Sequence, residues 1–195
     1  MKRDLQVDPQ GNPTNRRHFH VFDQAQVLNY ATILDHAQVC DQAIVRHDAS
    51  VWGHARISGS AQLEDMVTVS DHVQVRDNAV VTEDACLQDH AQVFDNAIIA
   101  DHAAVYQHAQ VYGQATVQRY ASVFGHAQVY GSALIGGHAR IYGQAHVSGH
   151  AQISGQAGIS GNAHITGTAN ILGGEWDGSE GEVNHGRWLS PGVPA

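Results

Sequence analysis

The sequence is poor in residues that define several common protein classes, since its 195 residues include only two cysteines, four prolines and 7% aromatics. Cys40 and Cys86 are too few for the disulfide framework that stabilises small secreted domains. No apolar run approaches the roughly 18 to 20 residues that cross a membrane as a helix, and the N-terminus lacks the apolar segment of a secretory signal. We therefore predict a cytoplasmic protein with no membrane partner.

Basic residues are also scarce. The chain has 10 Lys and Arg against 19 Asp and Glu, which gives a formal net charge of −9. Because nucleic-acid-binding surfaces are normally basic, no nucleic-acid partner is expected. The sequence contains no P-loop, nucleophile elbow, CxxC pair or dinucleotide-binding fingerprint, so none of the enzyme classes that carry those motifs is indicated.

What the chain does contain is one short repeat, most regular between residues 137 and 171. From Ala25 to Ala169 every sixth residue is alanine, except Val67 and Val73, and the residue two positions later is always Val, Ile or Leu. Residues at i and i+2 lie on the same side of an extended strand, and the next two positions carry turn-forming residues. Each hexad therefore predicts a short strand followed by a corner, and stacked coils would share one core.

Histidines indicate how many hexads make one coil. Seven of the nine residues at multiples of 18 up to residue 162 are histidines, so three hexads per 18-residue coil are predicted. The predicted fold is all-β: a single-stranded parallel β-helix of about eight coils over residues 19–172. Residues 1–18 form a polar lead-in, and residues 173–195 form an irregular cap. In this cap the side chains suited to cover the open coil end are Trp176, Val183, Trp188 and Leu189.

The run from Ala25 to Ile171 resembles the hexapeptide-repeat superfamily, and its density of Ala-x-Ile/Val hexads is similar to that of the YdcK-like members. The resemblance implies a left-handed winding, which the usual crossover rule would not favour. It also implies an acyltransferase as one possible activity, with a histidine base and acyl-CoA held between neighbouring subunits. Such enzymes usually build the site on an extruded loop, and this repeat array has no insertion. The related γ-type carbonic anhydrases place two zinc-ligating histidines five residues apart, a spacing that is absent here.

Two outward columns on the first face of the β-helix carry candidate binding residues. The glutamine column consists of Gln38, Arg56, Gln74, Gln92, Gln110, Gln128, His146 and His164; the histidine column consists of His36, His54, His72, His90, His108 and His126. Stacked amides can form hydrogen-bonded ladders. The histidines are interpreted first as corner residues that tolerate positive φ, and second as an imidazole ladder for borderline transition metals. We favour the corner interpretation and predict no metal.

A broken apolar stripe on the second face is formed by Ile44, Val80, Ile98 and Leu134. Exposed apolar stripes often mark association surfaces, so self-association into a trimer or dimer is expected there. The leading hypothesis for function is a non-catalytic scaffold or binding module that presents regular side-chain ladders and needs no cofactor. The alternative is an acetyl-CoA-dependent acyltransferase, for which the candidate bases are His102, His146 and His164.

Overall fold

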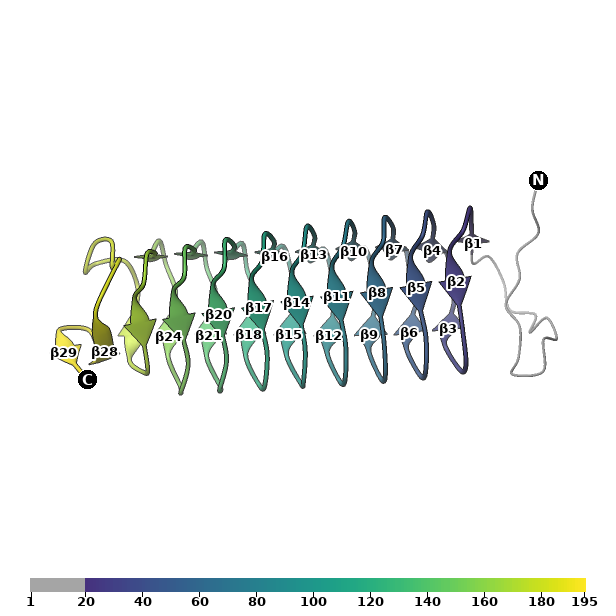
Figure 1. Cartoon of the computed structure of the whole chain (residues 1–195). Helices are drawn as coiled ribbons and strands as arrows, with labels where there is room; N and C mark the ends of the chain where they lie inside the picture. Colours follow the sequence, from purple (N-terminus) through teal and green to yellow (C-terminus); the bar gives the residue numbers. More distant parts are fainter. Residues whose placement is uncertain (1–19) are drawn as a thin grey trace.

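A computed structural model describes residues 20–195 as one parallel β-solenoid, with the coils stacked side by side along a single axis (Figure 1). Within these residues there is no helix, and the strands form three sheets of nine, eleven and nine strands. The all-β parallel solenoid predicted from the repeat is confirmed. The left-handed winding stays a prediction, and the predicted lead-in over residues 1–18 lies outside the described residues.

The three sheets are the three faces. The first face is formed by β1 (His20–Val21), β4 (Gln38–Val39), β7 (Arg56–Ile57), β10 (Gln74–Val75), β13 (Gln92–Val93), β16 (Gln110–Val111), β19 (Gln128–Val129), β22 (His146–Val147) and β25 (His164–Ile165). The second face is formed by β2 (Gln26–Val27), β5 (Ile44–Val45), β8 (Gln62–Leu63), β11 (Val80–Val81), β14 (Ile98–Ile99), β17 (Thr116–Val117), β20 (Leu134–Ile135), β23 (Gln152–Ile153), β26 (Asn170–Ile171), β28 (Arg187–Ser190) and β29 (Val193–Pro194). The third face is formed by β3 (Thr32–Ile33), β6 (Ser50–Val51), β9 (Thr68–Val69), β12 (Cys86–Leu87), β15 (Ala104–Val105), β18 (Ser122–Val123), β21 (Arg140–Ile141), β24 (Gly158–Ile159) and β27 (Glu175–Trp176).

The hexad repeat determines which residues form the core. From Ala31 to Ile171 every small and every aliphatic residue of the hexads is buried, whereas the residue between them points outward. In β13, for example, Val93 is buried and Gln92 faces solvent. Burial of each aliphatic side chain contributes roughly 1.5 to 3 kcal/mol. No single strand could bury such a face alone, so the stack of coils is the folding unit.

The coil length is 18 residues. Neighbouring first-face strands pair in parallel with Gln74 opposite Gln92 and Gln92 opposite Gln110. Hydrogen bonds between coils continue outside the two-residue strands, as where the backbone N–H of Phe94 donates to Val111 at 3.1 Å. The predicted three hexads per coil are therefore confirmed. The sheets exceed the predicted eight coils because β1 and the cap strands extend them.

Each corner contains one residue with a left-handed backbone conformation, and this residue occupies the first of the two turn positions. Non-glycine residues there have φ between 57° and 64°, and most of them are aspartates. Asp and Asn tolerate this conformation better than other non-glycine residues. The proposal that the histidine column itself takes positive φ is wrong: each of its histidines follows the left-handed residue. Among the described histidines only His47 has a positive φ.

The C-terminal residues continue the sheets and cover the last coil. Strand β27 pairs with β24 on the third face, and β28 pairs with β26 on the second and then with β29 in an antiparallel hairpin. Trp176 is 2% exposed, and its ring meets that of Trp188 edge to face at 6.2 Å. Leu189, which the sequence suggested as a further cover, is instead 51% exposed. In the described part of the chain no helix has the length and hydropathy to span a membrane.

Candidate binding groove

The histidine column is a continuous stack of rings. Each ring lies in the turn that precedes a first-face strand and is exposed to solvent. The centroids of successive rings from His36 to His126 are 4.9 to 5.0 Å apart, and their planes differ by only 3° to 13°. The spacing follows from the strand separation, because one ring is contributed by each coil. The ring planes face one another along the stack, so the ring edges with their nitrogens face solvent.

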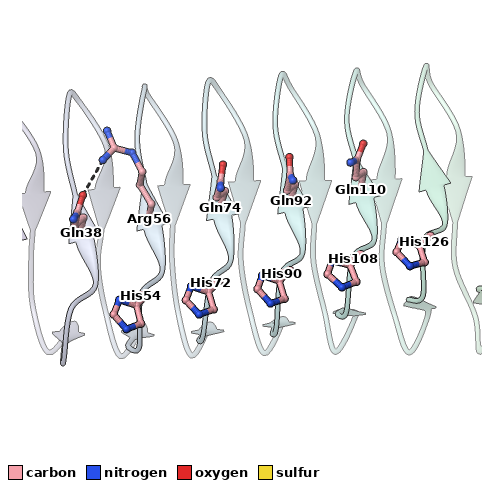
Figure 2. Close-up of a pocket in the computed structure, with 10 residues that line it drawn as sticks. All are labelled: Gln38, His54, Arg56, His72, Gln74, His90, Gln92, His108, Gln110 and His126. Atoms are coloured by element: carbon pink, nitrogen blue, oxygen red, sulfur yellow. Dashed lines mark hydrogen bonds between the residues drawn. The ribbon is translucent and has the colours of Figure 1, made fainter.

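A groove runs beside this stack over the strands of the first face. It has a volume of about 640 Å³ and is lined by residues of the two columns: Gln38, His54, Arg56, His72, Gln74, His90, Gln92, His108, Gln110 and His126. Figure 2 shows the imidazoles next to the turns and the amides over the strands, in two parallel rows. Each inner coil thus adds one imidazole and, except at Arg56, one amide to the groove.

Three of the four amides that line the groove are not used to hold the solenoid together. The side chain of Arg56 donates to Gln38 at 2.8 Å, but the side-chain amides of Gln74, Gln92 and Gln110 make no hydrogen bond within the described residues. The expected amide ladder is therefore not formed at these three positions. Their donors and acceptors remain available to a ligand, which could bond to both atoms of each amide.

The charge around the histidine column is uneven. Asp35, Asp71 and Asp89 lie in the turns of His36, His72 and His90, whereas the last two turns of the column carry Gln107 and Gly125. The pKa of Asp71 is lowered, first by a hydrogen bond from the Ser70 hydroxyl and then by the backbone N–H of Asp89 and by His72 and His90. The Asp89 carboxylate also accepts the N–H of Gln107 at 3.0 Å in the turn of His108, whereas the turn of His126 contacts the amide of Gln107 instead of a carboxylate.

The arrangement does not favour a metal site. Within residues 20–195 no group of three or more His, Cys, Asp or Glu side chains could hold an ion. In the stack the imidazole planes are nearly parallel, so their nitrogen lone pairs point in parallel directions, whereas chelation requires them to converge on one point. The column suits a ligand that spans several coils better than a single ion.

The three candidate catalytic histidines are not brought together. His102 lies in a turn between the second and third faces, where it stacks on Tyr120 at 4.9 Å and meets Asp84 at 3.3 Å. His146 and His164 lie on β22 and β25 of the first face and stack on each other at 4.9 Å. The pKa of His146 is lowered by burial and then by His164. This pair therefore extends the glutamine column toward the C-terminus.

The apolar stripe of the second face is interrupted. Val80 and Ile98 lie side by side, and Ile98 is 40% exposed. Gln62 separates Ile44 from Val80, and Thr116 separates Ile98 from Leu134. The stripe thus consists of one pair of adjacent apolar residues, Val80 and Ile98, and two isolated apolar residues, Ile44 and Leu134.

Stacks of aromatic rings run along other edges of the solenoid. Phe94, Tyr112 and Tyr130 stack as expected for residues 18 apart. A mixed stack of His102, Tyr120 and His138 was not anticipated, although the same spacing could have revealed it. All these rings lie face to face at about one coil spacing, so they offer edges rather than a flat platform to a ligand.

Comparison with known proteins supports the architecture. A family model described as the YdcK beta solenoid repeat matches residues 109–125. The same hexad phrase continues on both sides of this segment, and the parallel β-solenoid agrees with such a repeat. The resemblance to YdcK-like repeat proteins is thereby confirmed. No curated protein matches the chain.

Proposed function

We propose that the chain is a non-catalytic binding module: a β-solenoid that binds an elongated partner along the groove between its histidine and glutamine columns. The observation that carries this proposal is the repetition of unpaired amides and exposed imidazoles over successive coils. Free polar groups that recur at one spacing are suited to a ligand that is itself a repeating polymer. The stacked backbone holds these groups in register without any help from the ligand.

The regularity of the coils supports binding rather than catalysis. General acid–base chemistry needs a positioned side chain within reach of one reacting group, whereas the groove repeats the same groups many times. His102 lies in a turn, whereas His146 and His164 lie on strands of the first face, so the three cannot act on one reacting group. An acyltransferase would instead bind acetyl-CoA between subunits, an outcome that a binding assay distinguishes directly.

Self-association through the second face would complete this proposal. Val80 and Ile98 form the adjacent apolar pair of that face, and their removal from water would favour a dimer or trimer. The first face, with its groove, would remain accessible in such an assembly because it lies on a different side of the solenoid.

The test is a binding survey of neutral and acidic linear polysaccharides with the full chain and with two double variants. In Gln74→Ala/Gln92→Ala the groove loses two amides that make no internal hydrogen bond. The matched control Gln62→Ala/Gln152→Ala removes two outward glutamines from the second face. Binding of a polymer by the wild type and the control, with loss in the groove variant, supports the module. Turnover of acetyl-CoA that depends on His146 or His164, with no polymer bound, would refute it.

A further inference from the structure

We propose that the groove takes a linear acidic polysaccharide, a chain of uronic acid units laid along the solenoid axis, and that it does so when the histidine column is protonated. This inference rests on the proposed function and specifies its ligand. Each of the three coils at His72, His90 and His108 offers one imidazole beside one amide. A uronic acid unit carries a carboxylate and hydroxyl groups, which an imidazolium and an amide respectively recognise.

The spacing of the groove discriminates among polymers. Successive imidazoles lie 4.9 to 5.0 Å apart. An extended peptide places same-side side chains about 6.6 Å apart, so it would lose register with the imidazoles within a few coils. Single-stranded nucleic acid needs aromatic faces on which bases stack, and these rings present only edges. An extended glycan advances by about one six-membered ring per unit, and in a twofold chain the carboxylates on one side recur every second unit, so they would meet every second imidazole.

The charged groups that face the histidine column determine where along it an anionic ligand is favoured. Its own turns carry the carboxylates of Asp35, Asp71 and Asp89, and β7 carries the guanidinium of Arg56. The third-face residues that precede these turns carry no charge in acidic or neutral solution: Leu34, Trp52, Ser70, Gln88, Tyr106 and Phe124. The carboxylates oppose an anionic ligand as far as the turn of His108, where Asp89 accepts the N–H of Gln107, so the proposed contacts are strongest at His126.

Protonation would create the cationic strip. An imidazolium and a carboxylate carry opposite charges, so acidification that protonates the column strengthens their contact. Stacked imidazolium ions repel one another, and a bound row of carboxylates relieves that repulsion. The whole chain changes in the same direction: its formal charge is −9 with neutral histidines, and full protonation of the fifteen histidines brings it to +6.

The experiment measures binding of an oligogalacturonate, long enough to span the column, to the full chain by calorimetry at low salt. We expect affinity at about pH 5 to exceed that at about pH 8 by at least tenfold, since several charged contacts each worth roughly threefold are gained. The double variant His108→Gln/His126→Gln should bind about tenfold more weakly at the lower pH. Glutamine is a fair replacement because Gln144 occupies this corner naturally.

The control His138→Gln/His150→Gln removes two histidines from the other corners and should bind like the wild type. Equal affinity at both pH values, or equal weakening by both variants, would overturn the inference. Equally tight binding of polyphosphate or polyglutamate would overturn the assignment to a polysaccharide. A neutral glycan that binds equally at both pH values through Gln74 and Gln92 would refute this inference and leave the binding module standing. If no polymer binds, both this inference and the proposed binding module fail.

Discussion

The carboxylate of Asp101 accepts a hydrogen bond of 2.8 Å from the backbone N–H of Arg119, the residue one coil further along the axis. Asp101 in turn donates its own N–H to Glu83 at 2.7 Å. All three residues have left-handed φ. The same contact recurs at other acidic corners, for example from Gly59 to Asp41 at 2.9 Å. The acidic corners therefore link successive coils as well as turning the chain.

The stability of variants at Asp101 should depend both on how well the new residue tolerates the left-handed backbone and on whether it keeps the hydrogen bond to Arg119. Asp101→Ala loses the contact to Arg119 and places a Cβ-bearing residue without a polar side chain at φ 57°. We expect a loss of about 2 kcal/mol in unfolding free energy, from roughly 1 for each effect. Asp101→Gly should lose about half of this, and Asp101→Asn should lose least. Urea unfolding measures the order; an alanine variant as stable as the asparagine variant would contradict it.

The stability of the corner at Asp71 should depend on acid. Its folded pKa lies below the ordinary value of 3.8, because the Ser70 hydroxyl and the Asp89 N–H donate to the carboxylate. A lowered folded pKa means that the unfolded chain binds the proton more readily, so this contribution is complete above about pH 4 and disappears as the pH falls through the folded pKa.

The comparison is between the wild type and Asp71→Asn, with urea midpoints at about pH 5 and about pH 2.5. The variant should lose less stability than the wild type on acidification. Equal losses would show that Asp71 contributes nothing to the pH dependence.

Removal of Trp176 should open the C-terminal end. Trp176→Ala deletes a buried ring that lies over the last coils and against Trp188. We expect a cost of about 3 to 5 kcal/mol, felt mainly as faster hydrogen exchange in the coil before residue 171. The uncovered strand edges should also promote association, which light scattering detects. Leu189→Ala, at an exposed residue of the same cap, should change stability by less than about 0.5 kcal/mol.

Charge on the second face should weaken self-association. Val80→Glu/Ile98→Glu places two carboxylates at the adjacent apolar pair of the stripe. Light scattering coupled to gel filtration should then give a smaller mass than for the wild type, because two charges would have to leave water at the contact. Ser50→Glu/Ser122→Glu adds the same charge to the third face and should keep the wild-type mass. A reduced mass for both variants would move the interface elsewhere.

The sequence predicted the fold more fully than the groove. The alternation of Ala91 and Val93 around Gln92 was enough to assign the core, because burial in a strand follows a period of two. The recurrence of histidine every 18 residues was enough to assign the coil. These patterns depend on which residues stack, and stacking is dictated by the repeat itself.

The details of the groove depend on side-chain conformation and turn geometry, which the repeat does not encode. The sequence placed the left-handed residue at the histidines, but both turn positions carry residue types that tolerate positive φ, and only the first, such as Asp35, adopts it. The free amide of Gln92 could not be distinguished from a ladder partner, because residues 18 apart suit either arrangement. Likewise, the sequence placed Leu189 over the coil end, but apolar character alone does not decide which side of a short strand faces the core.

The 18-residue coil has a consequence for changes in chain length. Deletion of one whole coil would shorten every column by one residue and leave all the remaining columns aligned. Deletion of a single hexad would also preserve the alternation of buried and outward residues, yet every residue beyond the cut would move to the next face. The histidines on one side of the cut would then no longer continue those on the other. Length in this molecule can therefore change without loss of alignment only in steps of three hexads.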